Sequence, residues 1–324
     1  MPGAPPDGVA SVAMAHIQTV LGPVDPAAVG FTLPHEHTQI ALWHIENRWD
    51  YWQLTRDEPV ILHELARFRA AGGSCLVDVT LPGVGRDPAW LRGLAEASGL
   101  HIVMGCGWYR TAYYPPEARI DRRPVDDLAD ELVREVAHGV GESGVRPGII
   151  GEIGTDKPWL SPSEERVHRA VARASRQTGL AITTHAVLSD VGLAQLKIFE
   201  EEGADPARVV IGHADSYPVL AHHLAIIERG ANIEFDFIGM PWERERVGEG
   251  RTVEQVCELL GRGHVDRIFL SQDVCNDSQL KALGGNGYTY LTETFLPRLR
   301  AAGVGEAEIE AMTAGNPRRL LTIG

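Results

Sequence analysis

Several histidine and acidic side chains stand at the ends of short apolar segments, where they could bind metal ions. His35 and His37 flank Glu36 in the segment FTLPHEH (31–37). Because alternate residues of a strand point to the same face, the two imidazoles are expected to converge on one point. Comparable donors occur near the ends of four later segments: Glu152 in GIIGEIG, His185 in AITTHA, His213 in RVVIGHAD and Asp273 in RIFLSQD.

Four imidazoles and two carboxylates are a suitable ligand set for two borderline divalent ions, since six ligands exceed the needs of one tetrahedral ion. We expect Zn²⁺, with Mn²⁺ or Co²⁺ as alternatives. A pair of such ions can share a hydroxide and polarise the bond under attack, which is hydrolytic chemistry. A single HxH pair is weak evidence, and the prediction depends on all six residues. The other histidines fall in helices or loops, except His101, which begins its segment and would lie at the opposite rim.

The elements that must position these donors alternate along the chain. Eight strand-like segments are separated by stretches with helical periodicity. One of these helices has a well-marked start, with Ser161 as N-cap, Pro162 in the first turn and Glu164 completing a capping box. The strands are expected at 31–37, 74–80, 101–109, 148–154, 181–186, 208–215, 231–237 and 267–273.

Strands this apolar fit either a closed parallel barrel or a doubly wound sheet, and their number favours the α/β TIM (β/α)8 barrel. In such a barrel the carboxyl ends of the strands meet at one rim, where active sites form. The six donors are expected at that rim.

Length and composition predict one soluble domain. Residues 1–14, rich in proline, are expected to form a flexible tail before a single hydrolase domain at 15–324. The net charge of −14 disfavours nucleic acid and anionic membranes as partners and favours a small-molecule substrate. No apolar run approaches the ~20 residues that span a bilayer. Four cysteines without a CxxC pair predict reduced thiols and a cytoplasmic location.

The motifs TVLGPVDPAAVGFTLPHEH, GIIGEIGT, ITTH, GHAD, LSQD and LGGNGYTYL resemble the phosphotriesterase family of the amidohydrolase superfamily, from about Ile17 to Leu321. The resemblance implies that His35, His37 and Asp273 hold a more buried ion. It further implies that His185 and His213 hold a more exposed ion and that the fourth-strand residue, Glu152, bridges the two. A homodimer would be ordinary for this family.

Two departures from the family pattern bear on function. The namesake enzymes bridge their ions with a carboxylated lysine, whereas this chain has Glu152, as in the phosphotriesterase homology and phosphotriesterase-related proteins; Lys157 lies beyond that strand. After the seventh strand, organophosphate-degrading members have a histidine and lactonases an arginine, whereas this chain has Phe237. Tyr109 matches a tyrosine that lactonases keep.

These features predict a reaction in which a bridging hydroxide attacks an acyl or phosphoryl centre and Asp273 accepts the proton. Trp108, Tyr109 and Lys281 are the expected substrate contacts. Hydrolysis of a carboxylic ester or lactone is the leading hypothesis. An N-acyl amide comes second, a phosphotriester is a third candidate, and a barrel that binds a ligand without catalysis is disfavoured by the intact ligand set.

Overall fold

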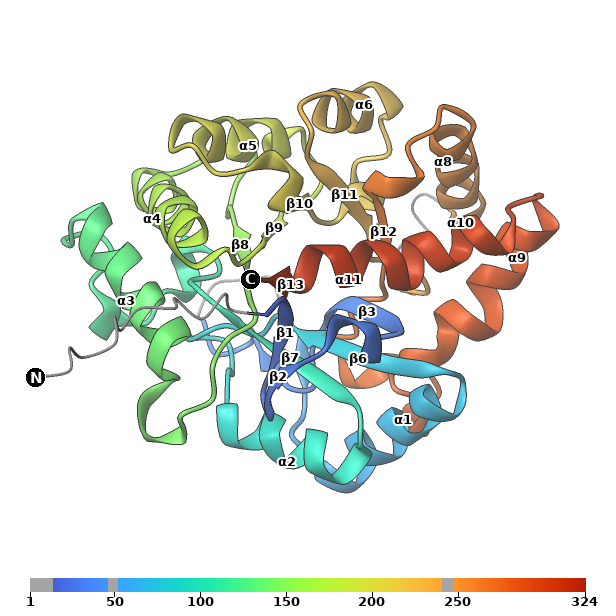
Figure 1. Cartoon of the computed structure of the whole chain (residues 1–324), viewed down its shortest axis with the longest axis horizontal. Coiled ribbons are helices and arrows are strands. Elements are labelled where there is room, and N and C mark those ends of the chain that lie inside the picture. Colours follow the sequence, from blue (N-terminus) through green and yellow to red (C-terminus); the bar gives the residue numbers. More distant parts are fainter. Residues whose placement is uncertain (1–13, 46–51, 241–247) are drawn as a thin grey trace, which may run out of the picture.

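The computed structural model describes residues 14–45, 52–240 and 248–324. Most of the predicted tail, residues 1–13, lies outside the described residues. Eight parallel strands form the central sheet, and helices surround it (Figure 1). In order around the sheet, the strands are β3 (Phe31–Glu36), β6 (Gly73–Asp78), β7 (His101–Cys106), β8 (Ile149–Gly154), β9 (Ile182–His185), β10 (Val209–Ile211), β11 (Asn232–Phe235) and β12 (Ile268–Leu270). The prediction of a TIM-type barrel with these eight strands is confirmed.

The strands are buried on both faces because their apolar residues alternate between two cores. In β6, Cys75 and Val77 belong to the core inside the barrel, together with Val103 and Phe269. Leu76 points the other way, into the larger core between the strands and the helices. Strands with apolar residues on both faces can be stable only when both faces are covered, which is why the segments read as continuous apolar runs.

The helices that cover the outer face follow the strands in sequence. The helix α4 begins as predicted, with Ser161 as N-cap and Glu164 completing the capping box. In the described part of the chain, no helix has the length and apolarity needed to cross a membrane. The helices are α1 (Glu58–Ala70), α2 (Pro88–Ser98), α3 (Val125–His138), α4 (Pro162–Thr178), α5 (Val191–Glu201), α6 (Leu220–Glu228), α8 (Glu249–Gly261), α9 (Leu296–Ala301), α10 (Glu306–Glu310) and α11 (Asn316–Leu321).

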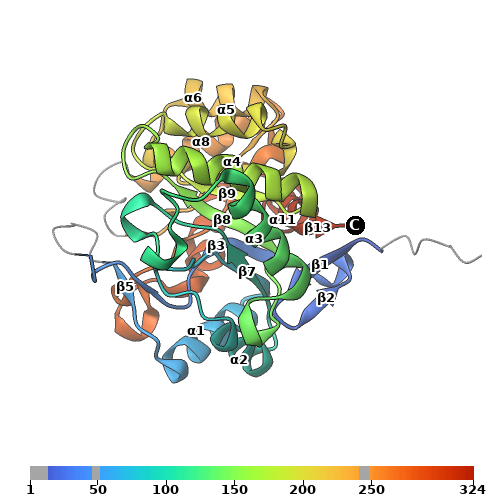
Figure 2. The ribbon, with the colours of Figure 1, turned by 90° about the vertical axis from the view of Figure 1, so that its left-hand side faces the viewer.

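Two small sheets lie at opposite ends of the barrel (Figure 2). An antiparallel sheet joins β1 (His16–Thr19) to β2 (Gly22–Val24) and to β13 (Thr322–Ile323), which places the C-terminus beside β1. The pair β4 (Ile40–Ala41) and β5 (Gln53–Leu54) lies at the other end. Residues next to this pair line the cavity described below, so β4 and β5 mark the functional rim.

The first and last strands of the barrel are joined through side chains. The carboxylate of Glu36 accepts hydrogen bonds from the Ser271 hydroxyl (2.8 Å) and from the backbone N–H groups of Gln272 (2.9 Å) and Val274 (2.8 Å). The backbone N–H of His35 also donates to Ser271 Oγ (3.1 Å). Glu36 therefore fixes the segment that follows β12 against β3, and Asp273 lies within that segment.

Replacing Glu36 with Gln tests this joint. The amide of Gln has one oxygen and one NH2 group, so at least one of the groups that now donate to the carboxylate would face another donor. We therefore expect the free energy of unfolding to fall by about 1–3 kcal/mol. Urea unfolding of chelator-treated protein, followed by tryptophan fluorescence, measures the change. Glu254→Gln, at an exposed position of α8, is the control; equal stability of the two variants would contradict the role given to Glu36.

Candidate metal centre

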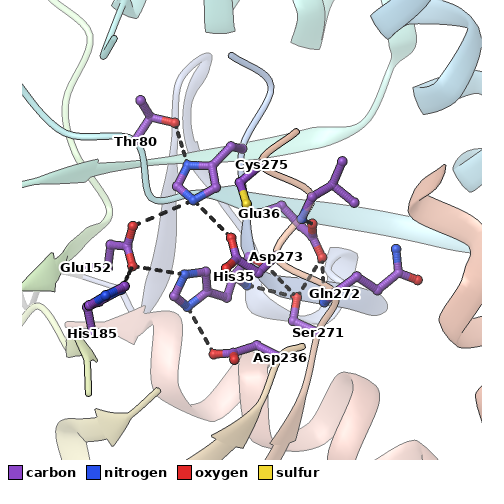
Figure 3. A network of polar contacts seen from close by, with 12 residues as sticks. His35, Glu36, Thr80, Glu152, His185, Asp236, Ser271, Gln272, Asp273 and Cys275 are labelled. Atoms are coloured by element: carbon purple, nitrogen blue, oxygen red, sulfur yellow. Dashed lines mark hydrogen bonds and ion pairs between the residues drawn. The ribbon is translucent and has the colours of Figure 1, made fainter. Parts of the chain in front are cut away.

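The six predicted donors come together at the carboxyl ends of the barrel strands, below a cavity of about 510 Å³. His37, Glu152, His185 and Asp273 form part of the cavity lining. His35 and His213 are fully buried beneath it. Figure 3 shows Glu152 between His35 and His185, with Asp236 on the other side of His35.

Both carboxylate oxygens of Glu152 face imidazole nitrogens. Its Oε2 lies 3.0 Å from Nδ1 of His185 and 3.4 Å from Nε2 of both His35 and His213. Its Oε1 lies 3.6 Å from Nε2 of His37. One buried carboxylate thus contacts all four predicted histidines, and from this position it could bind two ions at once.

Asp273 completes the group from the opposite side of the barrel. Its Oδ1 lies 3.2 Å from Nε2 of His37, and its backbone N–H donates to the carbonyl of His35 (3.2 Å). The carboxylate is thereby directed at the histidines of β3.

The donor atoms fit cations better than they fit one another. Both ring nitrogens of His35 and Oδ1 of Asp273 are buried and make no hydrogen bond within the described residues, although they face polar atoms at 3.2–3.4 Å. Buried polar atoms are rarely left this way. Two groups with mutually close donor atoms share Glu152, namely His35, His37 and Glu152, and Glu152, His185 and His213. The arrangement is therefore a candidate site for two ions, and nitrogen and carboxylate donors suit borderline divalent metals.

A threonine fixes which nitrogen of His37 is available. The Thr80 hydroxyl donates to the carbonyl of Gln39 (3.0 Å), so it can only accept from Nδ1–H of His37, which lies 2.8 Å away. The neutral imidazole then has its lone pair on Nε2, which faces Glu152 and Asp273. Such outer hydrogen bonds orient metal-binding histidines.

Asp236 orients two histidines at once. Its Oδ1 lies 2.8 Å from Nδ1 of His213, and its Oδ2 lies 3.3 Å from Nδ1 of His35. Burial lowers the pKa of His213, but the negative charge and hydrogen bond of Asp236 outweigh burial and raise the pKa to about 10. Surroundings that attract a proton this strongly also attract a divalent cation, whose binding would displace the proton.

The role of Asp236 is not among the predictions from the sequence, which concern this segment only for the histidine or arginine that other family members carry. The signal was nevertheless present. In the strand segment 231–237, Glu234 and Asp236 alternate with Ile233 and Phe235, so both carboxylates share one face. That face is the barrel interior, where Glu234 Oε2 lies 3.4 Å from Nδ1 of His35.

His213 and Asp273 are not on strands, although the predicted strands extended through them. The strands β10 and β12 end at Ile211 and Leu270. Both residues have left-handed backbone conformations, with φ of 57° for His213 and 44° for Asp273. Residues other than glycine rarely adopt this conformation, which clusters at functional sites. These turns direct both side chains at the centre of the site. If the strands continued instead, both residues would be carried further along the barrel axis.

The predicted substrate contacts are placed differently from one another. Tyr109 lines the cavity, with its hydroxyl 3.3 Å from Nδ1 of His185, and Phe237 also lines it while its ring stacks on His213. Neither Trp108 nor Lys281 is among the described residues that line the cavity. Trp108 is buried in the outer core, and Lys281 pairs with Glu293, so the geometry does not support substrate contact by either.

Two further side chains near the centre have no part in it. Lys157 lines the cavity with 60% of its side chain exposed, and its Nζ lies 3.9 Å from Oδ2 of Asp156. Cys275 lines the cavity, but burial, together with the charges of Asp273 and Glu152, raises its pKa well above the usual thiol value. It therefore stays a thiol.

Known proteins are similar to this chain in sequence and in structure over nearly its whole length. The model of the phosphotriesterase family matches residues 15–321. The phosphotriesterase homology protein of Escherichia coli K12 is 34% identical over 89% of this chain and 96% of its own length. The human N-acetyltaurine hydrolase is 30% identical over 94% of this chain and 97% of its own length. The crystal structure of a lactonase from Listeria monocytogenes, 26% identical, superposes with a TM-score of 0.86 over 95% of this chain and 99% of that one.

Asp236→Asn is expected to weaken metal binding about 10- to 100-fold, because the amide cannot both accept from His213 and hold His35 in place. Titration of the metal-free protein with Zn²⁺ against a competing chelator measures the affinity. Asp156→Asn, which changes a carboxylate of the cavity lining that belongs to none of the groups of close donor atoms, is the matched control. Unchanged affinity in the Asp236 variant would remove Asp236 from this role.

If Glu152 is the shared ligand, metal-free protein should regain its metal content and activity on addition of divalent metal alone. A carboxylated lysine would instead require carbon dioxide. Reconstitution in bicarbonate-free buffer, with and without added bicarbonate, distinguishes the two cases. Lys157→Ala should reconstitute like the wild type. If the wild type instead needs bicarbonate, and Lys157→Ala regains no metal with or without it, the bridging role belongs to Lys157.

Proposed function

The chain belongs to the phosphotriesterase family, and on that premise we propose that it is a two-metal hydrolase of carboxylic esters or lactones. The observation that carries the proposal is the position of Glu152, whose carboxylate faces all four imidazoles on the floor of the cavity. Two divalent ions held there would lower the pKa of a water molecule and polarise the oxygen of the bond under attack. Zinc as the native metal, a homodimer, a single domain at 15–324 and a cytoplasmic location stay predictions from the sequence.

The proposed roles of the ligands are those that the family resemblance implies. In this proposal His35, His37 and Asp273 hold the more buried ion, His185 and His213 hold the more exposed one, and Glu152 binds both. Of the two histidines assigned to the more exposed ion, His185 has 12% of its side chain exposed and lines the cavity, whereas His213 is fully buried.

Asp273 is the proposed general base. Its Oδ1 has no hydrogen bond within the described residues, and the side chain lines the cavity, so it can take the proton of the attacking water and pass it to the leaving group. Tyr109 is the proposed substrate contact, because its hydroxyl stands beside His185 at the cavity wall.

The cavity wall favours an acyl substrate with an apolar part. Leu42, Trp52, Phe237 and Met240 line one part of it. Phe237 replaces the polar side chain that organophosphate-degrading and lactonase members carry, so we expect poor turnover of long-chain acyl-homoserine lactones and of paraoxon. The second candidate is an N-acyl amide, which the name and 30% identity of the human N-acetyltaurine hydrolase favour.

A panel of substrates tests the proposal. Metal-loaded protein is assayed with small lactones, aryl acetates, N-acetyl amino acids, a long-chain acyl-homoserine lactone and paraoxon. The largest kcat/KM is expected for a small lactone or ester. A preference for the N-acetyl compounds would replace the first candidate with the second, and a preference for paraoxon would contradict both.

Asp273→Asn separates the two proposed roles of Asp273. The amide still offers an oxygen to a metal but cannot accept the proton, so we expect most of the metal to be retained while kcat falls by about 100-fold or more. Elemental analysis and turnover are measured on the same preparation. A fully active Asn variant would exclude Asp273 as the base, whereas loss of metal and activity together would leave it as a ligand alone.

A further inference from the structure

An exposed leucine lines the cavity in a backbone conformation that leucine rarely adopts. Leu188 is 46% exposed and forms part of the cavity wall. Its φ is 59°, in the left-handed region that is unfavourable for residues with a Cβ atom. The neighbouring Val187 packs against the outer core, whereas Leu188 belongs to neither core of the barrel. A single exposed leucine is ordinary, but one that is held in a strained backbone conformation points to a function.

A buried hydroxyl holds this conformation and connects it to the metal centre. The backbone N–H of Leu188 donates to Ser216 Oγ (2.9 Å), and the hydroxyl of Ser216 donates to the carbonyl of His213 (2.7 Å). Ser216 is itself buried, and the backbone of His213 is also left-handed. The same serine thus fixes two residues with rare backbone conformations, and such conformations persist only where the surrounding structure holds them.

The segment that carries Leu188 also follows the other ligand of the more exposed ion. Leu188 comes three residues after His185 in the sequence. The side-chain amide of Gln195, which is fully buried, donates to the backbone carbonyl of His185 (3.1 Å). This short segment is therefore fixed at both ends, by Gln195 at His185 and by Ser216 at Leu188. It presents an apolar side chain to the cavity from the same loop that follows a proposed metal ligand.

We propose that Leu188 is a specificity residue that contacts an apolar group of the acyl substrate, and that Ser216 is the positioning residue that holds it there. Strained residues cluster at ligand sites, where the surrounding structure maintains a conformation that a relaxed loop would leave. Burial of apolar surface against Leu188 would favour binding by about 4-fold for each methylene group. The substrate class is then an ester or amide with a short hydrocarbon group near the scissile carbonyl. This inference rests on the proposed hydrolytic function.

Matched esters measure the contact and identify the side of the scissile bond that makes it. Phenyl acetate is the reference, phenyl pentanoate has a longer acyl group, and 4-propylphenyl acetate has a longer leaving group. For at least one of the longer esters, the ratio of its kcat/KM to that of phenyl acetate should fall about 5- to 30-fold in Leu188→Asn. Leu283 is also exposed but is not among the described residues that line the cavity, so Leu283→Asn is the control. It should change the ratio by less than about 2-fold.

Stability separates contact with a substrate from a role in packing. Asparagine adopts a left-handed backbone more readily than leucine, so the melting temperature of metal-free Leu188→Asn should equal or exceed that of the wild type. A leucine kept for packing would instead give a fall of about 3 °C or more. We expect a stable variant that has lost the preference for a longer ester. An unstable variant, or a stable one with an unchanged ratio, would overturn the proposal.

Ser216→Ala tests the positioning role. Without the hydroxyl, the N–H of Leu188 loses its acceptor, so the same ratio should fall by about 3-fold or more. When Leu188→Asn is already present, Ser216→Ala should change the ratio by less than about 2-fold, because the contact that the serine positions is absent. Effects of the two substitutions that simply multiply would overturn the positioning role of Ser216.

Binding of the ester products to metal-free protein keeps this inference separate from the hydrolytic proposal. The product pairs are pentanoate with acetate and 4-propylphenol with phenol. The wild type should bind the longer member of at least one pair at least about 5-fold more tightly, and Leu188→Asn should abolish this preference. If it does so but metal-loaded protein cleaves no ester, lactone or amide, the hydrolytic proposal fails and the contact with Leu188 stands. Cleavage of esters with the same ratio in the wild type and in Leu188→Asn would overturn the contact alone.

Discussion

The carboxylate of Glu152 lies among four imidazoles that come from three different parts of the barrel, and the rest of the site depends on this contact. Its two oxygens are 3.0–3.6 Å from nitrogens of His35, His37, His185 and His213. Both ring nitrogens of His35 and Oδ1 of Asp273 are buried without a hydrogen bond in the described part of the chain, and added positive charge would stabilise them. Two cations would meet this need, and one carboxylate shared between them would keep them close enough to act on one substrate bond.

The surrounding fold serves to hold this cluster in one geometry. Thr80 and Asp236 fix the outward-facing nitrogens of His37 and His213. Glu36 points away from the centre and ties the segment with Asp273 to β3, so the first and last strands meet through a side chain. Metal binding, barrel closure and the position of the proposed base are therefore physically connected, since each acts through neighbouring residues of the HEH motif.

The sequence predicted the elements and the donors because both leave strong local signals. Apolar runs of strand length, and an HxH pair whose side chains share one face of a strand, can be recognised within a few neighbouring residues. The outer contacts were missed because they depend on which residues meet across the barrel, as Asp236 meets His35 and His213. The pairing of Lys281 with Glu293 left no local signal for the same reason.

Anomalous diffraction at the zinc absorption edge, from crystals of the zinc-loaded protein, tests the central claim most directly. We expect two zinc ions in each chain, with one oxygen of Glu152 bound to each ion and Asp273 bound to the ion held by His35 and His37. A single ion at full occupancy, or two ions of which only one contacts Glu152, would contradict it.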